Sequence, residues 1–122
     1  MLGLFQRPKL DVSFVVSKAV SNEFMREVEL TGRLALKNEG SDADVSGVEM
    51  MIIAGFRRIP LAIPEGWAMF RLARGQSRTE DVRWKLTLDA PLRAQAGELF
   101  VGVRDQKRKA WQWRLPFRFE LH

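Results

Sequence analysis

Apolar and polar residues alternate along most of this chain, and this alternation restricts the fold more than any other feature of the sequence. It runs through residues 10–16 and returns at 28–36, 82–88 and 99–103. Successive side chains of a β-strand leave on opposite faces, so a period of two is typical of strands with one buried face. Residues 48–56 form an apolar run interrupted only by Glu49, and there the pattern does not choose an inward face.

Turn-forming residues separate these runs at 38–44, 64–66, 75–77 and 105–109. Segment 17–28 differs, because Val20, Phe24 and Val28 have helical spacing; we interpret it as a long connection with room for one helical turn. Without repeats or linkers, the sequence predicts one domain over residues 1–122. Short strands at this spacing predict an all-β fold, an immunoglobulin-like antiparallel β-sandwich of seven or eight strands.

The last alternating stretch, residues 111–121, contains both aromatic and basic side chains, so the question is whether they lie on the same face of a strand. Its odd positions are all aromatic or leucine: Trp111, Trp113, Leu115, Phe117, Phe119 and Leu121. Its arginines occupy even positions, so the two kinds leave on opposite faces of a strand. Burying each large apolar side chain is worth about 1.5–3 kcal/mol, which favours a core strand over a base-stacking platform. Pro116 cannot donate a ladder hydrogen bond and predicts an edge strand or a bend.

Composition narrows the class of protein. The 122 residues are 46% hydrophobic and 29% charged, which is typical of a globular domain with a core of its own. The absence of cysteine excludes disulfides, thiolate metal sites and cysteine nucleophiles. We see no signal peptide and no apolar run long enough to span a bilayer, so we expect a cytoplasmic protein without a membrane partner.

The net charge of +5 comes from the second half of the chain, where residues 62–122 hold twelve Lys and Arg against seven Asp and Glu. Such an imbalance favours acidic partners. The predicted hairpin tip carries one basic cluster and the turn near residue 75 a second, and together they are the candidate partner or nucleic-acid contacts: Arg104, Lys107, Arg108, Lys109, Arg71, Arg74 and Arg78. These clusters either bind phosphates or an acidic protein patch, or keep solvated loops soluble. The sequence does not say whether they meet.

Catalytic and metal-binding patterns are weak. The single histidine is His122, and phosphate-binding glycine motifs are missing. Glu80 and Asp81 are neighbours on a strand and point apart. The turn Asn38–Asp44 could hold a hard cation, but Asn and Asp also close turns through backbone hydrogen bonds, and its spacing is not that of an EF-hand. We expect no catalytic residue, metal or cofactor.

Three segments carry a family resemblance. Residues 28–52, "VELTGRLALKNEGSDADVSGVEMMI", resemble the opening strands of prokaryotic immunoglobulin-like accessory domains of the CARDB type. Residues 70–86, with Gly75 in a turn and Trp84 on a strand, and residues 92–105 resemble later strands of the same families. Arrestin-like proteins and BsuPI-type intracellular proteinase inhibitors share similar patterns. The resemblance implies a two-sheet sandwich with a role in binding, and it brings no catalytic residues.

These observations predict a non-enzymatic protein-interaction or scaffolding module that binds through its loop tips and exposed strand edges. Self-association through an edge strand is compatible with the long last strand, although Pro116 would blunt it. The alternative is a small nucleic-acid-binding protein that uses the basic loop at 104–109. A third reading, inhibition of a cytoplasmic protease, comes from the resemblance alone.

Overall fold

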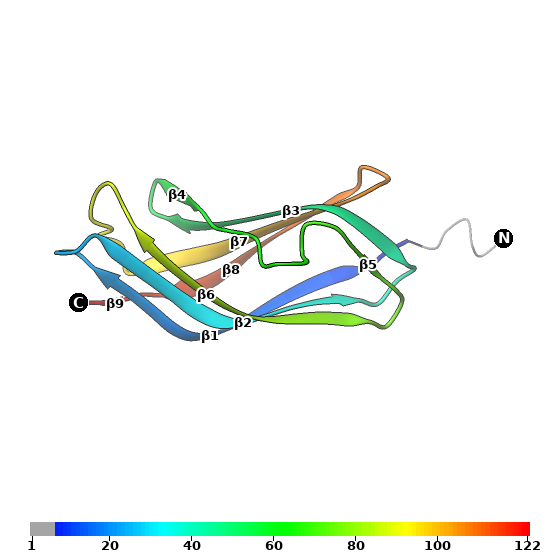
Figure 1. Cartoon of the computed structure of the whole chain (residues 1–122), viewed down its shortest axis with the longest axis horizontal. Helices are drawn as coiled ribbons and strands as arrows, with labels where there is room; N and C mark the ends of the chain where they lie inside the picture. The colour runs from blue at the N-terminus through cyan, green and yellow to red at the C-terminus, as the bar shows by residue number, and fades with distance from the viewer. Residues whose placement is uncertain (1–6) are drawn as a thin grey trace.

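The computed structural model describes residues 7–122, and there the chain forms two β-sheets packed face to face without any helix (Figure 1). Nine strands follow one another: β1 (Leu10–Asn22), β2 (Glu27–Asn38), β3 (Ala43–Ala54), β4 (Arg57–Pro60), β5 (Phe70–Leu72), β6 (Ser77–Thr87), β7 (Ala96–Asp105), β8 (Ala110–Arg118) and β9 (Glu120–Leu121). The predicted β-sandwich is therefore confirmed. The strand number exceeds the predicted seven or eight because β5 and β9, at three and two residues, are too short to alternate visibly. In this part of the chain, no helix has the length and apolar character needed to cross a bilayer.

The strands divide between a four-stranded sheet, in the order β6-β2-β1-β9, and a five-stranded sheet, in the order β4-β3-β7-β8 with β5 also paired to β3. The long pairings are antiparallel, as predicted. One pairing departs from the prediction: β9 lies parallel to β1, with Val20 opposite Glu120. The chain leaves β8 in one sheet and enters β9 in the other, so its last strand connects the two layers.

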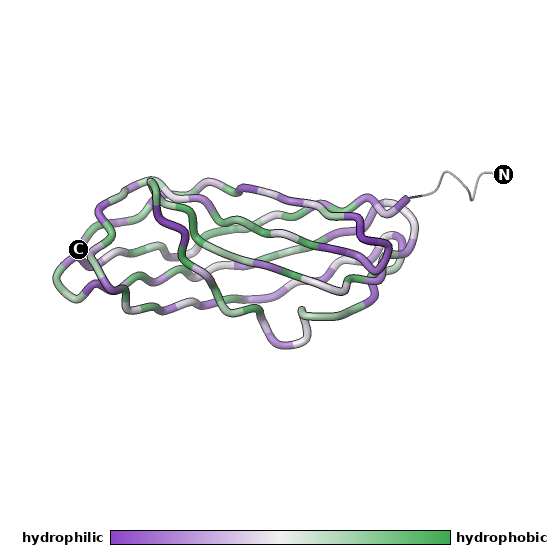
Figure 2. Tube along the Cα trace, turned by 90° about the horizontal axis from the view of Figure 1, so that it is seen from above, coloured by the Kyte–Doolittle hydropathy of each residue, from purple (hydrophilic) through white to green (hydrophobic). Residues whose placement is uncertain are grey.

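The core lies between the sheets and follows the predicted alternation, which Figure 2 shows as changes between green and purple along the strands. Leu30, Leu34 and Leu36 of β2 are fully buried, as are Leu99 and Val101 of β7. The apolar run that the pattern left undecided resolves in the same way. Its buried members are Met50, Ile52 and Ala54, while Met51 and Ile53 lie on the opposite face.

The final strands confirm most of the interpretation of residues 111–121. Phe117 and Phe119 are buried with their rings in an edge-to-face contact, 4.9 Å between centroids. Trp111, Trp113 and Leu115 are half-buried against the core, and the arginines between them are exposed. Leu121 is the exception at 40% exposed, because it lies in the two-residue β9 beyond the packed region. β8 is an edge strand, as Pro116 predicted.

The interpretation of segment 17–28 was wrong. β1 continues through Asn22, and the reversal takes only residues 23–26, where the side-chain oxygen of Asn22 accepts the N–H groups of Phe24 and Met25. A β-bulge between Val16 and Lys18 shifts the register against β2. One extra residue reverses which positions face inward. Inward residues are even-numbered before the bulge and odd-numbered after it, at Ala19 and Ser21.

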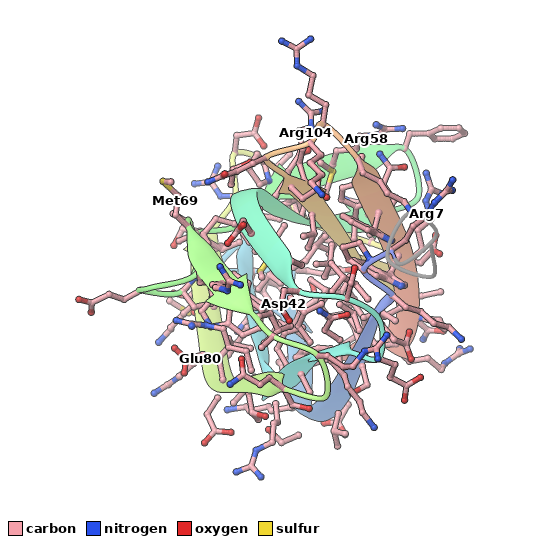
Figure 3. All side chains as sticks on the ribbon, turned by 90° about the vertical axis from the view of Figure 1, so that its right-hand side faces the viewer. Arg7, Asp42, Arg58, Met69, Glu80 and Arg104 are labelled. Carbon is pink, nitrogen blue, oxygen red and sulfur yellow. The ribbon has the colours of Figure 1, made fainter. Side chains whose placement is uncertain are left out.

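The two long sides of the sandwich differ. On one side, the connection 61–69 runs beside the edge strand β6 and bonds to it: the indole Nε1 of Trp84 donates to the carbonyl of Ala62 at 2.8 Å, and Arg78 donates to that of Gly66 at 2.7 Å. On the other side, β8 and β1 run alongside each other without pairing (Figure 3). β8 and β1 contact each other on this second side, but within residues 7–122 no connection covers it.

Candidate partner-binding surface

The β7–β8 hairpin presents the first predicted basic cluster on a well-defined tip. Asp105 is buried, its carboxylate accepts the N–H of Lys109 at 2.8 Å, and its carbonyl accepts that of Arg108 at 3.1 Å. Arg108 has a φ of 66°, as a tight turn requires. Lys107, Arg108 and Lys109 are exposed, and within residues 7–122 neither they nor Arg104 form an ion pair. The tip therefore carries cations that no acidic side chain of the described residues pairs with.

The second basic cluster is engaged in contacts within the chain. Arg71 pairs with Asp42 at 2.8 Å and with Asp44 at 3.8 Å. Arg74 donates its backbone N–H to Asp42 and its Nε–H to the carbonyl of Gly40 at 3.2 Å. These bonds tie the β2–β3 turn to β5 and to the segment after it. A partner contact through either arginine stays a prediction.

Arg78 has a different position from the other two members of that cluster. Its guanidinium lies 4.6 Å from the centroid of the Phe70 ring and 5.8 Å from that of Trp67, and it also bonds to the connection 61–69. Stacking on aromatic faces is a favourable use of a guanidinium. Arg78 thus covers aromatic core residues, and its contact with a partner also stays a prediction.

The two clusters do share one end of the sandwich. The backbone N–H of Gln106, in the hairpin turn, donates to the carbonyl of Asp44 at 3.0 Å, and Asp44 faces Arg71. Figure 3 looks at this end and shows Arg104 on the side of the five-stranded sheet and Asp42 nearer the middle. The turn-closing interpretation of Asn38–Asp44 holds for Asn38, whose side chain accepts the N–H of Gly40 and donates to the carbonyl of Ser41, whereas Asp42 and Asp44 pair with Arg71. Within residues 7–122, no three His, Cys, Asp or Glu side chains are grouped to hold a metal ion.

Asp42→Asn is expected to reduce the loss of stability in acid. The hydrogen bond from Arg71, and then that from the N–H of Arg74, lower the pKa of the Asp42 carboxyl below its ordinary value of 3.8. A carboxyl whose pKa is lower in the folded state stabilises the fold above its ordinary pKa, and that contribution is lost as pH falls through the lowered value. Urea unfolding at a series of pH values below about 5 should show a shallower decline for the variant.

The matched control is Glu65→Gln, because Glu65 is exposed and has no ion-pair partner among residues 7–122. It should leave the decline unchanged. An equally steep decline in Asp42→Asn would contradict the assignment.

Hydrogen bonding fixes which main-chain groups of β8 face β7 and which point away from it. Asp105 donates its N–H to the carbonyl of Lys109 at 3.0 Å, so this pair closes the ladder between β7 and β8. Bonded pairs alternate with non-bonded pairs along an antiparallel ladder. Odd-numbered residues of β8 therefore bond to β7, and the N–H and C=O groups of Gln112 and Arg114 point to the open side. Pro116 has the same orientation, so its missing N–H costs no ladder bond.

Two cations on this edge were not among the predicted site residues. Arg114 and Arg118 project from the outer face of β8, the face that Arg104 also shares. Arg114 has one acidic neighbour, Glu98, at 3.8 Å. The signal was present in the alternation of residues 111–121, but finding it required knowing that β8 is an edge strand. A shallow depression of about 340 Å³ lies nearer the hairpin end of this face, lined in part by Arg104 and Gln112.

The other sheet has a different outer face. Glu29 accepts hydrogen bonds or ion pairs from Lys18 at 3.2 Å and Arg83 at 2.9 Å, and Arg33 pairs with Asp81 at 2.9 Å. Most of the charges named on that face are thus matched by neighbours in the chain. The cations of the β7–β8 hairpin are largely unmatched, so a positive surface lies at the hairpin and along β8.

β8 and the part of β1 that β9 leaves unpaired, residues 10–19, are the long unprotected sheet edges. β4 has four residues and ends at Pro60, and β9 has only two. β6 is long, but Arg78 and Glu80 occupy inner-face positions opposite Leu36 and Leu34. Inward charges and short strands are common ways of preventing further strand pairing. β8 has nine residues, and its inner face carries half-buried tryptophans.

These features define the class: a two-sheet β-sandwich domain with a basic edge strand, β8. Among solved structures, the chain is similar to the ApaA protein from Bordetella pertussis, with 16% identity, a TM-score of 0.57, and coverage of 90% of this chain and 91% of that one. It is also similar to Spo0M, the sporulation control protein from Bacillus subtilis, with 15% identity and a TM-score of 0.61, covering 93% of this chain and 50% of that protein. Likeness at this level of identity shows the fold alone.

No protein-family model matches the chain, and no curated protein matches it. The comparisons therefore place the chain among small all-β proteins. They leave the resemblance to CARDB-type, arrestin-like and BsuPI-type proteins as an expectation.

Proposed function

We propose that this chain is a non-enzymatic protein-interaction module that accepts an extended segment of its partner at the open edge of β8. The observation that carries the proposal is the combination of an unpaired nine-residue edge, main-chain groups of Gln112 and Arg114 pointing away from β7, and half-buried Trp111 and Trp113 beside it. An added strand would satisfy the main-chain groups and cover the tryptophans. Spo0M is described as a sporulation control protein, a role that names no reaction.

The test uses one position of the edge. Gln112→Pro removes an N–H that points to the open side, and the native Pro116 at an equivalent position indicates that the fold accepts the change. Gln112→Ala keeps the N–H and is the matched control. Peptides selected from a random display library against the whole chain should bind Gln112→Pro about tenfold more weakly, and Gln112→Ala as tightly as the native chain. Equal binding to both variants, or no selected peptide at all, would contradict the proposal.

Nucleic-acid binding is the second candidate, and the unmatched cations of the hairpin tip favour it. Phosphate contacts by Lys107, Arg108 and Lys109 would weaken steeply with rising salt and would not depend on the N–H of Gln112. Single-stranded and duplex oligonucleotides in the same binding assay therefore separate the two candidates: salt-sensitive binding that Gln112→Pro leaves intact would favour nucleic acid.

A further inference from the structure

We infer that the strand accepted by β8 is acidic on one face and apolar on the other. The inference rests on the proposed function and names the chemistry of its partner. A strand added to β8 continues the sheet, so its side chains alternate between the outer face and the core side. Each of these two faces of β8 has its own composition, and the partner must match both.

The outer face of β8 favours carboxylates on the partner strand. A partner side chain on that face would lie beside Gln112, Arg114 and Arg118, with Arg104 and the hairpin tip at one end of the strand. Opposite charges directly across a strand pair are favourable and like charges are unfavourable. Glu98, 3.8 Å from Arg114, neutralises only part of this surface.

The core-facing side of β8 favours apolar side chains on the partner strand. Trp111, Trp113 and Leu115 pack against the core but remain partly exposed. The Lys109 ammonium lies 5.2 Å from the centroid of the Trp111 ring. Among the described residues, no cation lies over the Trp113 ring in the same way. Apolar partner residues at alternate positions would remove this surface from water.

A second copy of β8 fits this edge poorly. Its outer-face residues are Gln112, Arg114, Pro116 and Arg118, so antiparallel self-pairing centred on residue 114 or 116 sets arginine directly against arginine. Pairing centred on residue 115 sets Arg114 opposite Pro116 but diagonal to Arg114 and Arg118 of the copy. Pro116 would also leave each copy one donor short. The complement of this edge is therefore an acidic strand from a different protein.

Three synthetic peptides of about twelve residues test the inference, each long enough to pair along all of β8. One alternates glutamate with valine, one alternates serine with valine, and one has the glutamate–valine composition in blocks without alternation. Binding to the whole chain is followed by the fluorescence of the tryptophans at about 50 and about 300 mM salt. At low salt the alternating acidic peptide should bind about tenfold more tightly than the other two, and the advantage over serine should shrink at high salt.

The matched variants separate charge from strand pairing. Arg114→Glu with Arg118→Glu should remove the preference for glutamate over serine. Lys37→Glu with Lys85→Glu makes the same change of charge on the outer face of the other sheet and should keep that preference. Gln112→Pro should weaken both alternating peptides.

The outcomes distinguish this inference from the proposed function. Equal binding of the glutamate and serine alternating peptides, with both weakened by Gln112→Pro, would overturn the acidic partner and leave the edge as a strand acceptor. Failure of every peptide to bind would overturn both. Binding of the block peptide as tightly as the alternating one, or tighter binding of an oligonucleotide lost in the Arg114 and Arg118 variant, would overturn the paired acidic strand.

Discussion

Trp67→Ala is expected to lower the free energy of unfolding by about 3–5 kcal/mol, the largest effect of any single change considered for this chain. Trp67 is 1% exposed and is the largest fully buried side chain. It lies in the connection 61–69, outside any strand, where its ring meets that of Phe70 at 5.8 Å. Alanine would leave a cavity at the side of the sandwich that this connection closes, and would also remove one of the rings beside Arg78.

Urea unfolding followed by circular dichroism measures the effect without relying on tryptophan fluorescence. Phe56→Ala is the control, because Phe56 is also an aromatic residue outside a strand but is completely exposed. Its effect should stay within about 0.5 kcal/mol. A loss below about 1 kcal/mol for Trp67→Ala would mean that the connection is not part of the core. Domains of this kind are stable by only about 5–15 kcal/mol, so the variant is expected to be marginally folded.

Asn38→Ala is expected to cost about 2–4 kcal/mol, because one buried side chain connects three segments. Asn38 is 0% exposed. Its Oδ1 accepts the N–H groups of Lys9 at 3.1 Å and Gly40 at 3.0 Å, and its Nδ2 donates to the carbonyls of Ser41 at 2.7 Å and Leu72 at 2.9 Å. Alanine would leave these main-chain groups without partners in a region that water does not fully reach.

Asn22→Ala provides the comparison, since Asn22 also accepts two main-chain N–H groups through its side chain. Those bonds lie in the exposed β1–β2 turn, where water can replace them. We expect a loss below about 1 kcal/mol, measured in the same unfolding experiment. Equal losses at Asn22 and Asn38 would show that burial is not the cause.

The sequence predicted those parts of the fold in which one signal dominates. Alternation identified the inward residues of β2, β6 and β7, because a half-buried strand selects for it at every position. The alternation failed to identify the strand at Ser17–Val28. One bulge between Val16 and Lys18 changes which positions face inward, so the apolar residues after it showed a helical spacing instead of strand alternation. The alternation also could not choose between Met50 and Met51, since both faces of β3 are apolar there.

The candidate site could be predicted only in part. The hairpin cations are neighbours in sequence, so Lys107–Lys109 were visible as a cluster. Asp42 and Arg71 are 29 residues apart, and their pairing depends on β5 lying beside β3. The open edge depends on strand order, a property of the whole chain, and only Pro116 gave a local sign of it.

The parallel pairing of β1 with β9 has a consequence for how the molecule assembles. Val20 and Glu120 meet although 100 residues separate them (120 − 20). Bringing such distant segments together costs loop-closure entropy before any contact repays it, so chains of this topology fold in roughly milliseconds to seconds. On a ribosome, the β1–β2 hairpin can form early, whereas the four-stranded sheet lacks β9 until residue 121 has emerged.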